Sequence, residues 1–267
     1  MIEAVLARLG FASPPAADLD GLFALHRAYL RAIPFEDLAV QLGETGPLDE
    51  TLLTARLLAD GRGGYCFELN TVLACLLRSV GFEVTHHQAV VGGEGPTNHM
   101  ALLVQLDDGA WVADAGLGEG FLDPLPLREG AHPIGPFTYT LTREPSGTWW
   151  MGQHEWGSIS GVRMAVEPSP VAAFAPHHQR LAHDPDSPFV RTLVVQQPRP
   201  DRIVTLRART LSEVGPTVDR RHVVADVEEF AAVLADVFGI TLGGSRLERC
   251  WRQAVAQHES FAARVVG

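Results

Sequence analysis

The stretch RGGYCFELN at residues 62–70 places a cysteine behind two glycines and a tyrosine, where an apolar helical repeat begins. Apolar side chains then recur at helical spacing up to Gly81, which predicts a buried helix with Cys66 in its first turn. The free N–H groups and the positive dipole at a helix start favour the thiolate form of a cysteine. We expect Gly63 and Gly64 to permit close approach and to leave the sulfur open to a ligand. This setting predicts a nucleophile rather than a buried small hydrophobe.

The other two cysteines give weaker signals. Cys75 falls beside the apolar stripe of the same helix, which predicts a position in the core. Cys250 lies in a polar helical segment near the C-terminus and carries no indication of reactivity. An odd and sparse set of cysteines is typical of a reducing compartment rather than of a disulfide framework, so we expect a cytoplasmic protein.

Composition excludes several classes of function. The chain has 46% hydrophobic and 20% charged residues, as an ordinary globular protein does. A net charge of −11 leaves no electrostatic footprint for nucleic acid or for an anionic membrane. All 21 basic residues are arginine, which excludes Schiff-base lysine chemistry and a lysine-dependent phosphate loop. We find neither a signal-peptide pattern nor an apolar run of about 18 residues that would predict a membrane span.

The sequence pattern changes twice along the chain. Residues 1–84 show helical periodicity in segments that end at Pro34 and Gly61. Residues 85–195 form short alternating runs between glycine- and proline-rich turns, which predicts antiparallel strands. Residues 196–267 begin near RIVTLRARTL, which we expect to be one strand, and then return to helix. The predicted fold class is α+β, with three parts at these boundaries.

A thiol nucleophile needs a base, and the base needs a residue that orients it. His99 opens the predicted strand HMALLVQL, and Asp114 closes the predicted strand AWVADA. The turn DDG joins the two strands into a hairpin that brings both residues to the same end. With a turn at Asp108 and Gly109, Asp114 would lie opposite Leu103, so we expect a bulge or strong twist to bring it to His99.

The remaining histidines fit a catalytic or metal-binding role less well. His86 and His87 have no acidic partner at a strand end, so we rank them below His99. His177 and His178 are adjacent and would point apart. Paired metal ligands at the spacing of CxxC or HxxxH do not occur in the sequence, so we predict no metal site.

Three motifs, RGGYCFELN, NHMALLV and ADAGLG, resemble in this order those of the arylamine N-acetyltransferases. LHRAYLRAIPFEDL resembles the N-terminal motif of that family, in which an Asn often stands at the position of Asp37, and DPDSPFVRTLVVQQP resembles its second-half signature. The resemblance covers nearly the whole chain. It implies a helical bundle, a β-barrel and an α/β lid around a Cys-His-Asp triad of the kind found in cysteine proteases. By motif, that triad is Cys66, His99 and Asp114.

The resemblance also implies an activity. It points to transfer of an acetyl group from acetyl-CoA to the nitrogen of an arylamine or hydrazine, by a ping-pong mechanism through an acyl-Cys66 thioester. The thioester is then a donor substrate and no cofactor is permanently bound. The family further implies a structural ion pair between Arg62 and Glu36. We expect the acceptor to contact Phe35, Phe67 and Leu117. We expect the donor to contact Gly95, Thr97 and Gly118.

Two residues depart from the family pattern, and they leave alternatives open. Leu117 replaces an aromatic residue, and Glu119 stands where a small residue is usual. The Glu119 carboxylate could repel a CoA phosphate, but a loop position favours one that points to solvent. One alternative is an amide synthase that takes its acyl group from an acyl carrier protein and closes a polyketide on its own arylamine. The others are a thiol hydrolase or transglutaminase-like enzyme and a non-catalytic binding protein.

Overall fold

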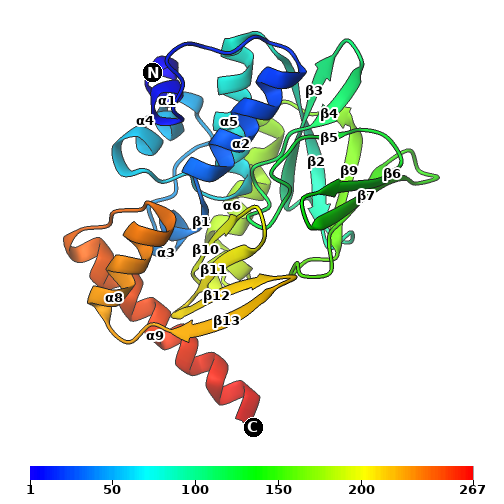
Figure 1. Cartoon of the computed structure of the whole chain (residues 1–267). Coiled ribbons are helices and arrows are strands. Elements are labelled where there is room, and N and C mark those ends of the chain that lie inside the picture. The colour runs from blue at the N-terminus through cyan, green and yellow to red at the C-terminus, as the bar shows by residue number, and fades with distance from the viewer. Residues whose placement is uncertain (267) are drawn as a thin grey trace.

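Helices dominate the first part of the chain in the computed structural model, which describes residues 1–266 (Figure 1). Their bounds are α1 (Ile2–Arg8), α2 (Leu19–Ala32), α3 (Leu38–Leu42), α4 (Glu50–Asp60) and α5 (Cys66–Val80). The Asp18 carboxylate caps α2 by accepting from the Gly21 N–H, and α2 ends before Pro34 as expected. The long helix α5 ends at Gly81, whose φ of 116° suits glycine. The prediction of a helical first part is therefore confirmed.

The second part forms an eight-stranded antiparallel sheet, which makes a nearly closed barrel. The strand order is β5-β4-β3-β2-β9-β8-β7-β6. The strand bounds are β2 (Glu83–Val91), β3 (His99–Leu106), β4 (Gly109–Val112), β5 (Leu125–Pro126), β6 (Gly130–Ile134), β7 (Phe137–Arg143), β8 (Trp149–Gly152) and β9 (Gly161–Pro168). Alternate residues of β7 are buried, which is the pattern of strands that cover a core on one face.

The turn between β3 and β4 lies one residue earlier than the sequence suggested. Leu106 pairs with Gly109, so the turn residues are Asp107 and Asp108. Gly109 begins β4 with a φ of 130°, a backbone conformation that only glycine adopts without strain. The expected turn at residues 108–109 is therefore wrong.

This earlier turn brings the two ends of the hairpin closer together. Leu103 pairs with Val112 rather than with Asp114, and the Ala113 N–H continues this register by donating to the Leu102 carbonyl oxygen at 3.1 Å. Continued by two positions, this register sets Asp114 beside Ala101, the neighbour of His99 on the same face of β3. The expected bulge between β3 and β4 is not what closes the gap. The register shift that the barrel does contain lies between β2 and β9.

The third part is a five-stranded antiparallel sheet with helices on it. Its order is β1-β10-β11-β12-β13, so the short strand β1 (Phe35–Glu36) of the N-terminal part forms one edge. The other strands are β10 (Val194–Pro198), β11 (Ile203–Arg207), β12 (Thr210–Gly215) and β13 (Val218–Val223). The segment RIVTLRARTL is therefore two strands rather than one, because the chain turns at Ala208 with a φ of 50°.

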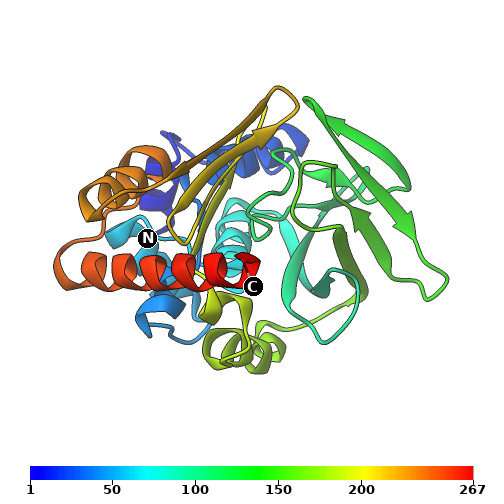
Figure 2. The same cartoon turned by 90° about the horizontal axis from the view of Figure 1, so that it is seen from below.

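Helices flank this sheet in sequence and in space. The helical segment η1 (Val171–Phe174), α6 (Ala175–His183) and α7 (Pro188–Arg191) precedes β10, in a region where we had expected strands only. After β13 come α8 (Val227–Ala232), the π-helix η2 (Val233–Val237) and α9 (Gly244–Val266). Figure 2 shows α9 running alongside the sheet, and Figure 1 shows its C-terminal end extending beyond the rest of the fold.

Three clusters of buried side chains hold the parts together. The largest surrounds α5 and joins the N-terminal helices to β3. The second lies between α3, the five-stranded sheet and the C-terminal helices, and includes Cys250. The third fills the barrel and includes Leu117 and Phe121. None of the helices described within residues 1–266 combines the length and hydropathy that a membrane span requires.

Candidate active site

Cys66 is the first residue of α5, and its side chain is buried at the boundary between α5 and the barrel. Its Sγ lies 3.5 Å from the carbonyl oxygen of Asn98, directly before β3. The start of α5 is fixed by Glu68, whose carboxylate accepts from the Tyr65 N–H at 3.3 Å and from Arg56 at 2.8 Å. The sulfur is therefore held where the first N–H groups of a helix have no acceptor within the helix.

The glycine that adjoins Cys66 is Gly116 rather than either glycine of the pair before it. A Cβ added to Gly116 would lie 2.7 Å from the Cys66 Cα. A Cβ on Gly63 would instead meet Ile33, and one on Gly64 would meet the Glu68 carboxylate. The glycine pair thus allows the chain to turn tightly into α5. The expectation that it opens the sulfur to a ligand is wrong, because a different loop lies against Cys66.

His99 and Asp114 form a buried ion pair near Cys66. The Nε2–H of His99 donates to the Oδ2 of Asp114 at 2.6 Å, and both side chains are almost fully buried. Burial by itself would lower the pKa of His99. The charge of Asp114 and its hydrogen bond to His99, followed by the neighbouring Cys66, outweigh burial and raise this pKa to about 10. Burial likewise opposes ionisation of Asp114, but the charge of His99 and its hydrogen bond lower the pKa of that carboxyl. These opposite shifts favour the imidazolium form of His99 and the carboxylate form of Asp114, each of which stabilises the charge of the other.

The other carboxylate oxygen of Asp114 is held by Asn70, one turn along α5 from the cysteine. Its Nδ2 donates to Asp114 Oδ1 at 2.8 Å, and its Oδ1 accepts from the Ala115 N–H at 2.9 Å. The Gly116 N–H also donates to Asp114 Oδ1, at 2.8 Å. These donors fix the carboxylate plane against His99 and add to the stabilisation of its charge.

A second histidine, His26 of α2, supports Asp114 from the opposite side. Its Nε2 accepts from the backbone N–H of Asp114 at 3.1 Å. Its Nδ1 donates to the carbonyl oxygen of Leu122 at 2.9 Å, since a carbonyl can only accept. Burial lowers the pKa of His26, and the ring is stacked on Phe121. A neutral His26 thus ties together the two ends of residues 114–122, which we call the Asp114 loop.

Glu119, within the Asp114 loop, is buried rather than directed to solvent. Its Oε1 accepts from the backbone N–H groups of Ser158 and Ile159 at 2.7 and 2.9 Å. Its Oε2 accepts from the Ser158 hydroxyl at 2.9 Å and from Gln196 of β10 at 3.0 Å. Only 2% of the residue is exposed. The expectation of a solvent-facing carboxylate is therefore wrong, because the loop between β8 and β9 folds over this position.

The residues expected to bind substrate lie in different surroundings. Phe67 is fully buried in the main core, where it packs against Tyr65 and Phe174. Leu117 is 7% exposed and belongs to the barrel core. Phe35 lies at the start of β1, opposite Gln196 of β10.

The residues expected to bind the donor are also dispersed. Gly118 adjoins Phe35 and Gln196. The Thr97 hydroxyl, shortly before β3, donates to the side-chain oxygen of Gln88 in β2 at 2.8 Å. Gly95 lies in the loop between β2 and β3 with open space beside it. Their contacts with a donor stay predictions.

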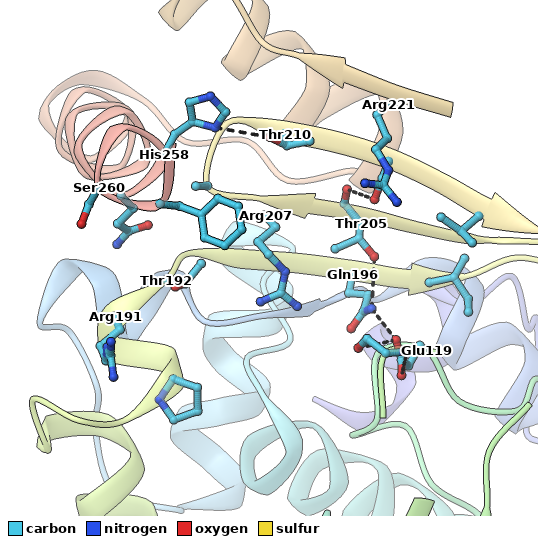
Figure 3. Close-up of a pocket in the computed structure, with 18 of the residues that line it drawn as sticks. Glu119, Arg191, Thr192, Gln196, Thr205, Arg207, Thr210, Arg221, His258 and Ser260 are labelled. Atoms are coloured by element: carbon cyan, nitrogen blue, oxygen red, sulfur yellow. Dashed lines mark hydrogen bonds between the residues drawn. The ribbon is translucent and has the colours of Figure 1, made fainter. Parts of the chain in front are cut away.

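A cleft of about 920 Å³ opens between the five-stranded sheet, α7, the end of α9 and the Asp114 loop. Its inner end is formed by Gln196 and by Glu119 of the Asp114 loop, whose Gly116 lies against Cys66. Three arginines line it, namely Arg191, Arg207 and Arg221. Figure 3 shows Arg207 pointing from β11 into the cleft toward α7. The lining also contains hydroxyl side chains and the carboxylates of Glu119 and Asp186.

Other buried polar groups are structural. Arg62 lies 3.6 Å from Glu36, and both side chains are buried, so the expected ion pair is confirmed. His178 contacts the Tyr65 hydroxyl and donates to the Gly46 carbonyl oxygen at 2.8 Å. His86 lies 3.2 Å from an Arg78 nitrogen, and burial followed by that charge lowers its pKa to about 4. Within residues 1–266, no group of three His, Cys, Asp or Glu side chains could hold a metal ion.

Comparison with known proteins agrees with this geometry. A family model described as N-acetyltransferase matches residues 18–247. The chain is 35% identical over 239 residues to the arylamine N-acetyltransferase / N-hydroxyarylamine O-acetyltransferase of Salmonella typhimurium, covering 83% of this chain and 82% of that protein. The chain belongs to the arylamine N-acetyltransferase family. As a member of this family it is an acetyltransferase enzyme.

Solved arylamine N-acetyltransferases have the same fold. The Mycobacterium abscessus enzyme superposes with a TM-score of 0.87 at 28% identity, covering 96% of this chain and 95% of that one. The Mycobacterium marinum enzyme, solved in complex with CoA, has a TM-score of 0.86 at 22% identity, covering 95% of this chain and 98% of that one. The predicted combination of helices, antiparallel barrel and α/β part is thereby confirmed.

Sequence reasoning missed two residues that hold Asp114 and its loop in place. His26 lies in LHRAYL, a segment with an ordinary helical pattern, and nothing in it indicates a partner 88 residues away. Asn70 gave a fainter signal, since an amide four residues after Cys66 falls on the same face of α5.

Proposed function

We propose that the protein transfers an acetyl group from acetyl-CoA to the nitrogen of an arylamine or hydrazine by a ping-pong mechanism through acetyl-Cys66. The observation that carries the proposal is the position of Cys66 at the start of α5, close to a buried His99 that is hydrogen-bonded to Asp114 and whose pKa is raised by that carboxylate. Since His99 uses Nε2 for Asp114, its Nδ1 is the nitrogen that remains for the sulfur. An imidazolium beside the sulfur stabilises a thiolate, which is the nucleophilic form.

In the first half-reaction, the Cys66 thiolate attacks the carbonyl carbon of acetyl-CoA. A carbon–sulfur bond to Cys66 forms, the carbon–sulfur bond to CoA breaks, and the CoA thiolate takes a proton from the His99 imidazolium. One thioester replaces another, so the acyl-enzyme lies close to the donor in energy. The free N–H groups at the start of α5, that of Cys66 included, are candidate donors to the oxyanion of the tetrahedral intermediate.

In the second half-reaction, the amine attacks the carbonyl carbon of acetyl-Cys66. A carbon–nitrogen bond forms and the bond to Cys66 breaks, while His99, now neutral, accepts a proton from the amine. The products are the acetylated amine, a Cys66 thiolate and a His99 imidazolium, so the starting state is restored. Asp114 favours the imidazolium and fixes its orientation throughout.

The cleft supports the choice of a CoA thioester as donor. CoA carries several phosphate charges, and the cleft presents Arg191, Arg207 and Arg221 in a chain whose net charge is −11. Because lysine is absent from the sequence, arginines and backbone amides must bind these phosphates. Since a ping-pong enzyme releases CoA before the amine reacts, one cleft can serve both substrates in turn.

The experiment is intact-protein mass spectrometry after mixing with acetyl-CoA, with and without an arylamine such as aniline. An acetyl adduct that is absent in Cys66→Ser and discharged by the amine is the expected result. An adduct discharged by water alone would indicate a hydrolase. If acetyl-CoA gives no adduct while a longer or carrier-bound thioester does, the donor assignment is wrong and the amide synthase takes its place.

A further inference from the structure

Residues 153–159, which belong to the loop between β8 and β9, also help to form the inner end of the cleft. Trp156, Gly157 and Ser158 line the cleft there, next to Glu119. In the described part of the chain, the Phe, Tyr and Trp side chains that line the cleft are Trp156 and, near the end of α9, Phe261. Trp156 is the one at the end near the Asp114 loop.

Glu119 holds this loop in place. Three of the four hydrogen bonds that its carboxylate accepts come from Ser158 and Ile159, and the fourth comes from Gln196 of β10. Gly157 passes so close that an added Cβ would lie 3.2 Å from Glu119 Oε1. The buried carboxylate thus joins the Asp114 loop, the 153–159 loop and the five-stranded sheet, and it sets the position of Trp156 between them.

The Trp156 side chain packs against two rings of the protein and is also partly exposed to the cleft. Its ring packs edge-on against Phe137 at 5.9 Å and lies 6.1 Å from the ring of His154, while the residue stays partly exposed toward the cleft. Leu117 and Phe121 of the Asp114 loop offer no such surface. Leu117 is 7% exposed within the barrel core, and Phe121 is fully buried against His26.

We propose that Trp156 is the surface on which the aromatic ring of the acceptor packs, and that Glu119 is the positioning residue that fixes it. The proposal rests on the function proposed above and names the acceptor side of that site. A planar indole beside an apolar wall favours an aromatic ring over an alkyl group, since two rings gain stacking or edge-to-face contact beyond simple burial. Trp156 is then the side chain by which the site favours an aromatic acceptor over an alkylhydrazine.

The test compares KM for aniline with KM for methylhydrazine, which has the reacting nitrogen but no ring. In Trp156→Ala the KM for aniline divided by the KM for methylhydrazine should rise about tenfold, because only aniline has a ring to pack on the indole. Trp156→Phe should restore most of the original ratio. Glu119→Ala should raise the same ratio. Glu155→Ala is the matched control, because Glu155 lies exposed in the same loop. Trp156→Leu keeps an apolar side chain of substantial volume, should Trp156→Ala fail to fold.

The outcomes separate this proposal from the function on which it rests. Formation of acetyl-Cys66 by the wild-type protein and its discharge by aniline establish the reaction. Given that, an unchanged ratio in the Trp156 variants, or an equal rise of both KM values, overturns the role of Trp156. A ratio that rises in Trp156→Ala but not in Glu119→Ala overturns the positioning role of Glu119. If acetyl-Cys66 never forms, the proposed function itself fails.

Discussion

The cluster around Cys66 and the cleft beside it are built in opposite ways. In the cluster, Cys66, His99 and Asp114 are all nearly inaccessible to solvent, and Asp114 accepts hydrogen bonds on both carboxylate oxygens. In the cleft, Arg207 extends from β11 and Arg221 from β13, and both side chains are exposed (Figure 3). The Cys66 cluster is therefore held by packing and saturated hydrogen bonds, whereas the three arginines of the cleft are exposed to solvent.

This difference has an energetic consequence. Removing one partner in the buried cluster leaves another polar group without a hydrogen bond and away from water, which costs about 1–3 kcal/mol and disturbs the reacting geometry. Removing a side chain from the open cleft leaves its neighbours solvated, so the free energy of unfolding changes little and only binding suffers. Substitutions in the two regions should separate effects on rate and stability from effects on KM.

Asp114→Asn should have the largest effect. The amide cannot stabilise the imidazolium, and the pKa of His99 loses the charge that chiefly raises it, so we expect kcat to fall by about 10³–10⁴-fold. Alkylation of Cys66 by iodoacetamide at pH 7 should slow as well. In the wild type, Cys66 should react before Cys75 and Cys250, because burial raises their pKa values to about 11 and about 12. Equal labelling of the three wild-type thiols would contradict this mechanism.

His26→Leu comes next and acts on stability and rate together. It removes the acceptor of the Asp114 N–H and leaves that group buried, so the free energy of unfolding should fall by about 1–3 kcal/mol in a urea titration. His26→Gln keeps a side-chain acceptor and should lose less. A variant His26→Leu with unchanged stability and unchanged kcat would mean that the Asp114 loop does not depend on this contact.

Arg207→Gln probes the open region. We expect KM for acetyl-CoA to rise about tenfold with kcat unchanged, since a charge-assisted contact with a phosphate is worth about 1.5–3 kcal/mol at most. The effect should shrink as salt increases. Arg220→Gln is the control, because Arg220 is exposed on β13 without being part of the cleft lining. Equal effects of both substitutions would point to long-range charge rather than to a specific contact.

Asp37→Asn should have the smallest effect, and it should be stabilising. Burial, and then the charge of Glu36, hold the pKa of Asp37 well above its ordinary value. Because the folded-state pKa is the higher one, the protonated carboxyl favours the folded state at acid pH, and that contribution is lost as pH rises through the raised pKa. The Asn variant avoids this loss, so Tm should rise by about 2–4 °C at pH 8 and by less at pH 5. A gain independent of pH would exclude ionisation of Asp37 as its cause.

Local sequence signals predicted a substantial part of this molecule. The start of α5 at Cys66, its end at Gly81 and the helical first part follow from residues that are neighbours along the chain. The strand that opens at His99 was equally visible. The hairpin turn was misplaced by one residue, because Asp107, Asp108 and Gly109 all suit a turn, and only packing against β2 and β5 selects the register.

What the sequence by itself determined is the local setting at the start of α5. It places a cysteine in the first helical turn, and a histidine and an aspartate at the ends of two joined strands. What only the tertiary structure decided is which distant groups meet that chemistry. Glu119 became a buried link rather than a surface charge because the 153–159 loop supplies donors to it. His26 became the support of Asp114 because α2 packs against the Asp114 loop. Hydrogen bonds between segments far apart in the chain depend on how those segments pack, and no local periodicity encodes that.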